Sequence, residues 1–231
     1  INKNVTEENL LEACAAAFGK GWRAVKLYFM MGLPTETDED ILGIADLAKK
    51  VANLKRGVKI TISVACFVPK PFTPFQWAGM NTADEFLRKA HLLGDEFKNQ
   101  INKKSLKFQY HENNLSELEG LFARGDRRLS KLLRTAYNKG CLYDSWSECF
   151  DVNKWNEAIE ECGVDLSFYT QRERGLDEKF PWDFIDIGVT KDFLRNQWLE
   201  AHSERVTPNC RQKCSGCGAA KFGGGVCFEK R

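Results

Sequence analysis

The feature that most constrains the fold is the alternation of short apolar strands with amphipathic helices in the first half of the chain. Strand patterns occur at 23–31, 58–67 and 106–110. Helical patterns follow Thr6, Thr37 and Thr82, which are N-capping residues placed just before an apolar stripe. Both faces of the first two strands are largely apolar, which is typical of strands covered on both sides. The sequence therefore predicts a parallel α/β fold.

Three parallel strands are too few to close a barrel. The sheet is therefore either a small open sheet or the end of a larger barrel that begins upstream. Beyond His111 the strand pattern fades, and helices are predicted at 115–122, 127–139 and 151–162. We expect three regions, namely the sheet at 1–111, a mainly helical extension at 112–200 and a cysteine-rich tail at 201–231.

Composition adds little about partners. The 231 residues are enough to bury a core, and 34 basic against 32 acidic residues leave a net charge of +2. Acidic residues predominate in 151–200 and basic residues in the tail. We find no long apolar run and no secretory signal, so we expect a cytoplasmic protein with no membrane contact.

The segment from Gly32 to Asp40 connects the first strand to a helix. It aims free backbone N–H groups at the carboxyl edge of the sheet, where α/β proteins bind ligands. A phosphate would meet the carboxylates that crowd this helix start, so an amine or a ribose hydroxyl suits the edge better. The alternative is that the acidic residues only complement the helix dipole.

The loop from Phe67 to Trp77 follows the second strand at the same edge of the sheet. Three prolines restrict its backbone. Phe72, Phe75 and Trp77 are suited to wall an apolar pocket or to stack on a base, and Lys70 is the charge able to reach a ligand. The alternative is a rigid loop that caps a barrel mouth.

Residues 27–40 resemble the late-strand motif of radical SAM enzymes, in the broad group that includes methylthiotransferases and oxygen-independent coproporphyrinogen oxidases. Residues 64–77 resemble the strand that follows and its proline-threonine-proline loop. Further motifs resemble one uncharacterised family, the radical SAM proteins with an upstream cobalamin-binding domain. They are Arg-Gly-Asp-Arg-Arg at 124–128, Asp-Ser-Trp-Ser-Glu at 144–148, Pro-Trp-Asp at 181–183 and Thr-Pro-Asn-Cys at 207–210.

The resemblance implies the last strands of a partial (β/α) barrel that binds S-adenosylmethionine, an iron–sulfur cluster and, through the upstream domain, cobalamin. The family's catalytic CxxxCxxC precedes these strands, and no such motif precedes Leu27 here. We therefore expect this chain to depend on an N-terminal region of the same protein, to hold no catalytic residue and to be inactive alone. The implied contacts with S-adenosylmethionine are Gly32, Leu33, Pro34, Thr35, Glu36, Thr37, Val68 and Pro69.

The cysteine-rich tail predicts a separate metal site. Its first cysteines share the CxxxCxxC spacing of a radical SAM cluster, but they follow a helical region rather than a strand. A Cys-x-x-Cys-Gly turn is a common metal knuckle, and four thiolates suit zinc or a closed iron–sulfur cluster. The alternative is free thiols in a basic tail. The proposed ligands are Cys210, Cys214, Cys217 and Cys227.

The remaining cysteines lie in or beside apolar patterns and are predicted to be core thiols: Cys14, Cys66, Cys141, Cys149 and Cys162. A run of basic residues either tracks an RNA backbone or forms a solvated helix face paired with the acidic stretch. That run comprises Arg124, Arg127, Arg128, Lys131, Arg134 and Lys139.

Two functions are consistent with these features. The first is the C-terminal part of a radical SAM enzyme whose substrate is unknown. The alternative is a non-catalytic zinc-knuckle module that binds RNA or a protein partner.

Overall fold

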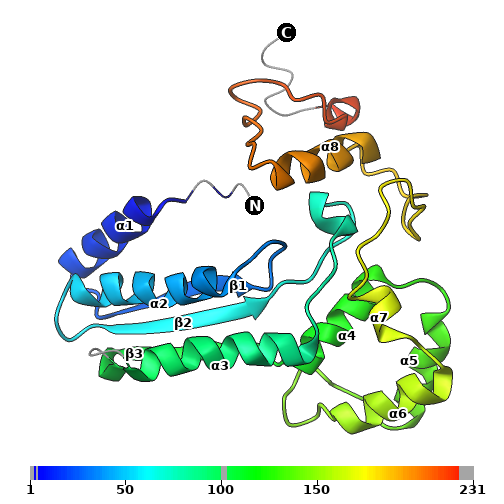
Figure 1. Ribbon diagram of the computed structural model, residues 1–231, viewed down its shortest axis with the longest axis horizontal. Coiled ribbons are helices and arrows are strands. Elements are labelled where there is room, and N and C mark those ends of the chain that lie inside the picture. The colour runs from blue at the N-terminus through cyan, green and yellow to red at the C-terminus, as the bar shows by residue number, and fades with distance from the viewer. Residues whose placement is uncertain (1–2, 4, 100–102, 224–231) are drawn as a thin grey trace. The chain divides into compact units, whose positions relative to one another are not determined.

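The computed structural model describes residues 3, 5–99 and 103–223, which divide into two compact units (Figure 1). The sheet unit consists of Lys3–Val68 and Met80–Glu119. The helical unit consists of Pro69–Gly79 and the chain from Gly120 onward. The loop between the second strand and the third helix thus belongs to the helical unit rather than to the sheet that it leaves.

The sheet unit contains three parallel strands in the order β1-β2-β3. They are β1 (Ala24–Met31), β2 (Lys59–Cys66) and β3 (Leu106–Tyr110). Leu27 lies opposite Ile62, which in turn lies opposite Phe108. The prediction of a mixed α/β fold with parallel strands is confirmed.

Helices cover one face of this sheet. They are α2 (Asp38–Asn53) and α3 (Ala83–Asn99), whereas α1 (Glu7–Gly19) packs against α2. Because each strand is added next to the preceding one, right-handed crossovers place α2 and α3 on the same side, where they pack against each other. Leu27, Ile60 and Ile62 point to the covered face and are buried.

The other face of β1 is open. Tyr28 is 74% exposed and Met30 is 37% exposed, whereas Ser63 on the neighbouring strand is 8% exposed. The prediction that β1 is covered on both sides is therefore wrong for this chain. Both crossover helices lie on one side, so the apolar residues of the second face have no helix over them in the described part of the chain.

The predicted helix caps are confirmed. Thr6 and Asn9 form a capping box at α1, and Thr37 and Asp40 form one at α2. At α3 the Thr82 hydroxyl accepts a hydrogen bond of 3.1 Å from the Glu85 N–H. These caps satisfy N–H groups that the first turn of a helix leaves without backbone partners.

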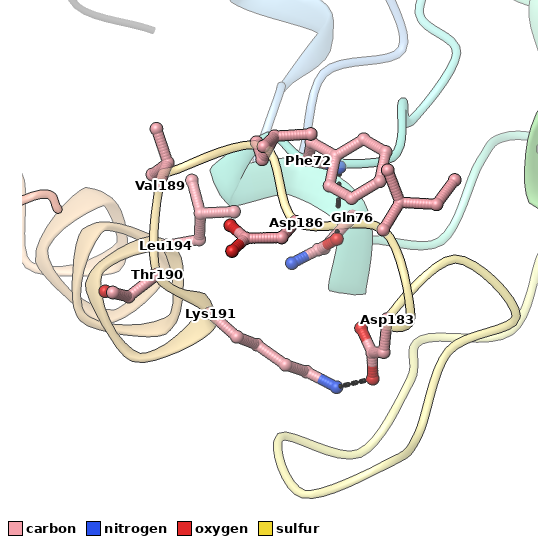
Figure 2. A pocket seen from close by; sticks show the side chains of 10 residues that line it. Phe72, Gln76, Asp183, Asp186, Val189, Thr190, Lys191 and Leu194 are labelled. Atoms are coloured by element: carbon pink, nitrogen blue, oxygen red, sulfur yellow. Dashed lines mark hydrogen bonds and ion pairs between the residues drawn. The ribbon is translucent and has the colours of Figure 1, made fainter. Parts of the chain in front are cut away.

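The helical unit is built from short helices. They are the end of α4 (Asn113–Arg124), α5 (Leu129–Asn138), α6 (Val152–Cys162), α7 (Leu166–Tyr169), α8 (Lys191–His202) and the turns η1 (Pro74–Trp77) and η3 (Ala219–Phe222). The fully buried Trp77 packs on Phe180 with ring centroids 5.6 Å apart. Phe72 and the loop 183–191 line a cavity between η1 and α8 (Figure 2). Among the described residues no helix is long and apolar enough to cross a membrane.

The core-thiol prediction holds for two of its five cysteines. Cys14 and Cys66 are buried, and burial raises the pKa of the Cys66 thiol to about 11. Cys141 and Cys162 are half-buried. Cys149 is exposed, so its assignment to the core is wrong, because it lies in a turn after Trp146 rather than on a helix face.

A buried arginine connects three segments of the helical unit. Arg124 is 1% exposed, and its guanidinium donates hydrogen bonds to the carbonyl oxygens of Ala78, Thr170 and Arg172. Arg174 donates back to the Arg124 carbonyl at 2.8 Å. Burial, followed by the nearby charge of Arg174, lowers the pKa of Arg124 from its ordinary value. The arginine therefore holds the loop 69–79 against the segment after α7.

We expect Arg124→Met to lower the free energy of unfolding by about 3 kcal/mol, because it leaves buried carbonyl groups without donors. Arg127→Met is the matched control, since Arg127 is exposed and its replacement should change stability by less than about 0.5 kcal/mol. Urea denaturation of the two variants measures the difference. Equal stabilities would contradict the role assigned to Arg124.

Candidate functional site

Two residues of the turn after β1, Gly32 and Thr35, have left-handed backbone conformations. Gly32 has φ 84°, and a Cβ atom there would lie 2.3 Å from Cε1 of Phe86. Thr35 has φ 66°, in the left-handed region that side chains other than glycine rarely adopt. Strained residues of this kind cluster at ligand-binding sites, which is consistent with a functional role for the turn.

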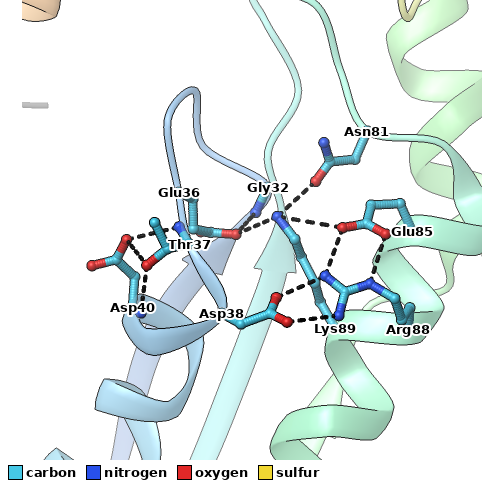
Figure 3. Close-up of polar contacts among 9 residues, drawn as sticks. All are labelled: Gly32, Glu36, Thr37, Asp38, Asp40, Asn81, Glu85, Arg88 and Lys89. Atoms are coloured by element: carbon cyan, nitrogen blue, oxygen red, sulfur yellow. Dashed lines mark hydrogen bonds and ion pairs between the residues drawn. The ribbon is translucent and has the colours of Figure 1, made fainter.

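A buried ion pair holds this turn against α3 (Figure 3). The Glu36 carboxylate accepts hydrogen bonds from the Gly32 N–H at 2.7 Å and from the Lys89 ammonium at 2.9 Å. Both charged side chains are only 6% exposed. Lys89 also donates to Asn81 Oδ1 at 3.1 Å. The pair therefore fixes the path of the chain from β1 into α2.

The acidic side chains at the start of α2 are engaged within the protein. Asp38 forms two hydrogen bonds with Arg88, at 2.7 and 3.0 Å, and Asp40 accepts from Thr37. Hydrogen bonds from these partners lower the pKa of both carboxyls. Their stabilising effect is complete at neutral pH and is lost as the pH falls below the ordinary value of about 4. The contacts favour the structural role of these acids over recognition of an amine.

A hollow of about 310 Å³ lies beside the turn in the sheet unit. Phe29 and Met30 from the end of β1, Ile44 from α2 and residues 33–36 of the turn line it, together with Asp40. Four of the six turn residues predicted to contact S-adenosylmethionine thus face one open space, namely Leu33, Pro34, Thr35 and Glu36. Its lining is mainly apolar, which fits a ring or an aliphatic chain better than a charged group.

The other predicted contacts lie elsewhere. Gly32 is buried under Phe86, and Thr37 caps α2. Val68 is the last residue of the sheet unit before the loop and Pro69 is the first residue of the helical unit, and both are buried. Of the three loop aromatics, Phe72 lines a cavity that is half polar rather than the apolar pocket predicted, whereas Trp77 is in the core and Phe75 packs edge-on against Trp198.

The cysteine-rich tail is joined to the segment that precedes α8. The Thr190 N–H donates to the Cys217 carbonyl at 2.9 Å, and a Cβ atom at Gly218 would lie 2.6 Å from the Gly188 carbonyl oxygen. Gly216 and Gly218 have φ of 69° and 97°, which only glycine adopts readily. These turns fit a metal knuckle, in which backbone N–H groups approach the sulfur atoms.

The described residues do not assemble a complete metal site. Cys210 and Cys214 are exposed and Cys217 is half-buried. No group of three or more His, Cys, Asp or Glu side chains that could hold a metal ion comes together in the described ranges. Cys227, the fourth predicted ligand, lies outside the described residues.

The basic run does not act as one surface. Arg124 is buried, which removes it from any RNA contact. Lys139 pairs with Glu157 at 3.3 Å and Glu161 at 3.2 Å on α6, as the solvated-face alternative predicts. The remaining members are exposed, and one of them, Arg128, pairs with Asp126. An RNA contact stays a prediction for Arg127, Arg128, Lys131 and Arg134.

Two buried polar side chains, Lys89 and Gln76, are not predicted from the sequence. Lys89 lies three residues after Phe86 and four before Leu93, so its spacing alone places it on the apolar stripe of α3. A charged residue on such a stripe is a signal for a buried ion pair. Gln76, which is 2% exposed, has no comparable signal because it lies in an irregular loop.

The chain is similar to the uncharacterized protein MJ0966 of Methanocaldococcus jannaschii, with 33% identity over 164 residues. The match covers 71% of this chain and 35% of that protein. The chain thus spans about a third of the length of the relative that it matches. No family model and no solved structure matches the chain.

We expect Lys89→Met to lower the free energy of unfolding by about 3–5 kcal/mol, because it leaves Glu36 charged and buried without its partner. The double variant Glu36→Gln/Lys89→Met should recover part of that loss, which a double-mutant cycle measures. Lys50→Met is the control, since the Lys50–Glu7 pair is about half exposed and should contribute less than about 1 kcal/mol. Equal losses for the two lysine variants would refute the buried-pair account.

Proposed function

We propose that this chain is the C-terminal part of a radical SAM enzyme of the type that carries an upstream cobalamin-binding domain. The observation that carries the proposal is the singly wound sheet, with α2 and α3 on one face and a hollow at its carboxyl edge. Strands added in one direction with all helices outside build the wall of a (β/α) barrel. The open face of β1, with Tyr28 and Met30, would then face the barrel interior.

In this proposal the turn after β1 forms one wall of the S-adenosylmethionine site. Leu33 and Pro34 supply an apolar surface, Thr35 a strained backbone, and the Glu36–Lys89 pair fixes the turn. The hollow's size and mainly apolar lining fit part of such a cofactor. When bound at the catalytic cluster, S-adenosylmethionine supplies a radical by reductive cleavage. In this proposal the residues of this chain contribute to the cofactor site but supply none of the ligands of the catalytic cluster.

The motifs at 124–128 and 181–183 have structural roles in the helical unit, because each holds the loop at 69–79. Arg124 holds the loop that follows β2, and Trp182 donates a 2.9 Å hydrogen bond to Gln76 in the same loop. The extension therefore shapes the loop that contains the predicted cofactor contact Pro69. We assign the protein to the cytoplasm, where a reducing environment keeps thiols available for ligation.

We expect Leu33→Arg to abolish S-adenosylmethionine binding by the protein extended through its N-terminal cluster region, because the longer charged side chain enters the hollow. Leu54→Arg is the matched control, since Leu54 caps the opposite end of α2 and is 41% exposed. Anaerobic binding of the cofactor and formation of 5′-deoxyadenosine after reduction provide the readouts. Retention of both by the Leu33 variant would refute the proposed site.

We further propose that the tail cysteines bind zinc or a closed iron–sulfur cluster. The left-handed glycines around Cys217 support a knuckle, and basic residues lie close to the cysteines in the sequence. A site closed by four thiolates leaves no position for S-adenosylmethionine, so its role would be structural or electron transfer. Arg211 and Lys213, which lie between the first two cysteines, are part of this basic environment.

Cys214→Ser should remove the bound metal, whereas Cys149→Ser should leave metal content unchanged because Cys149 is an exposed thiol outside the tail. Elemental analysis of anaerobically purified protein gives the zinc and iron contents, and visible absorbance identifies an iron–sulfur cluster. A Cys214 variant with full metal content would eliminate the tail site.

The second candidate function is a non-catalytic zinc-knuckle module that binds RNA or a protein partner. The same glycine turns favour it, and the exposed Arg127, Arg128, Lys131 and Arg134 provide positive charge. Colourless protein with stoichiometric zinc, together with no cofactor cleavage by the extended protein, would favour this module. Iron–sulfur absorption with cofactor cleavage would favour the enzyme.

A further inference from the structure

The cavity of the helical unit has the features of a ligand site that uses none of the residues of the strand-edge hollow. Its volume is about 200 Å³, and half of its ten lining residues are apolar. Phe72 comes from the loop before η1, Leu194 comes from α8, and Ile185, Ile187 and Val189 come from the segment between them (Figure 2). A closed cavity of about 150 Å³ is large enough to hold benzene, so this half-open space has room for one ring with a small substituent.

One buried amide is directed into this cavity. Gln76 is 2% exposed, and its Oε1 accepts hydrogen bonds from the Phe72 N–H at 3.2 Å and from Trp182 Nε1 at 2.9 Å. These two donors fix which end of the amide is oxygen, so the nitrogen is the end that points into the open space in Figure 2. In the part of the chain that the structure describes, Nε2 has no acceptor. The amide therefore offers N–H donors to an occupant of the cavity.

The loop is held in a strained conformation around this amide. Phe72 has φ 60°, a conformation that an aromatic residue adopts at an energetic cost. The hydrogen bond from its N–H to Gln76 stabilises that conformation and places its side chain on the wall of the cavity. The strained residue, Phe72, and its hydrogen-bond partner, Gln76, are thus the two side chains that an aromatic ligand with an acceptor group would contact.

The charges around the cavity are already paired. Asp183 pairs with Lys191, and Asp186 pairs with Lys221. Lys191 also donates to the Glu178 carbonyl at 2.6 Å. Because each carboxylate has a lysine partner, neither an anionic nor a cationic ligand gains a free counter-charge there. The polar group that remains is a neutral donor.

From these observations we propose that the cavity binds a neutral six-membered ring that carries a carbonyl group, the size of benzamide or a pyrimidine base. The carbonyl oxygen accepts a hydrogen bond from Gln76 Nε2, and the ring lies against Phe72 and the aliphatic side chains. A hydrogen bond from Gln76 Nε2 to the carbonyl oxygen adds to the stabilisation that burial of the ring provides.

The test uses the full chain and three ring probes of similar size: benzamide, toluene, which lacks the acceptor, and benzoate, which is charged. Ligand-observed NMR titration should give saturable binding of benzamide, at least tenfold tighter than toluene or benzoate. Toluene binding as tightly as benzamide would overturn the role of the amide. Tighter binding of benzoate would overturn the neutral ligand class, and no saturable binding of benzamide would overturn the site.

Gln76→Glu isolates the amide nitrogen. The variant keeps an oxygen to accept from Phe72 and Trp182, and these hydrogen bonds favour its ionised form, which donates none. Benzamide binding should weaken at least tenfold, while Gln109→Glu, an exposed change on β3, should bind as the parent does. Unchanged binding by a folded Gln76 variant would contradict the proposal. If that variant does not fold, the preference of the parent chain for benzamide over toluene decides the question.

Discussion

The buried ion pair between Glu36 and Lys89 is the interaction on which the carboxyl edge of the sheet depends. Neither charge is stable at 6% exposure without the other, so α3 and the turn after β1 must keep their relative position. Gly32 adds a steric constraint, because its Cα approaches Phe86 of the same helix too closely for any side chain. Together these contacts give the hollow beside the turn a fixed wall, which is the property that a cofactor site needs.

The hydrophobic pattern and the helix-capping residues predict the strands and helices of the sheet unit. They do not predict which face of the sheet the helices cover. The alternating strands and Thr37 with Asp40 predicted the β1–α2 connection, and the structure has both. Periodicity predicts a covered face for the exposed Tyr28, because it identifies apolar residues without showing what lies over them. The sequence groups Arg124 with a basic surface, because spacing does not reveal that three carbonyl groups surround its guanidinium.

The candidate sites show the same contrast between features that local pattern predicts and features that depend on tertiary packing. The turn at 32–37 was found because a strand that ends before a capped helix is recognisable from sequence, and Leu33 to Glu36 do line an open space. Gln76 was missed because its burial depends on Trp182, which lies 106 residues further along the chain. Contacts at that separation depend on tertiary packing, which no local pattern encodes.

The proposal that the turn after β1 binds S-adenosylmethionine is tested most directly by hydrogen–deuterium exchange on the protein that includes the cluster region the proposal requires. Addition of the cofactor should slow exchange of the amides at 32–37 and leave those at 54–57, past the far end of α2, unchanged. Slower exchange confined to the first segment is the predicted result. Identical exchange at 32–37 with and without bound cofactor would contradict the account.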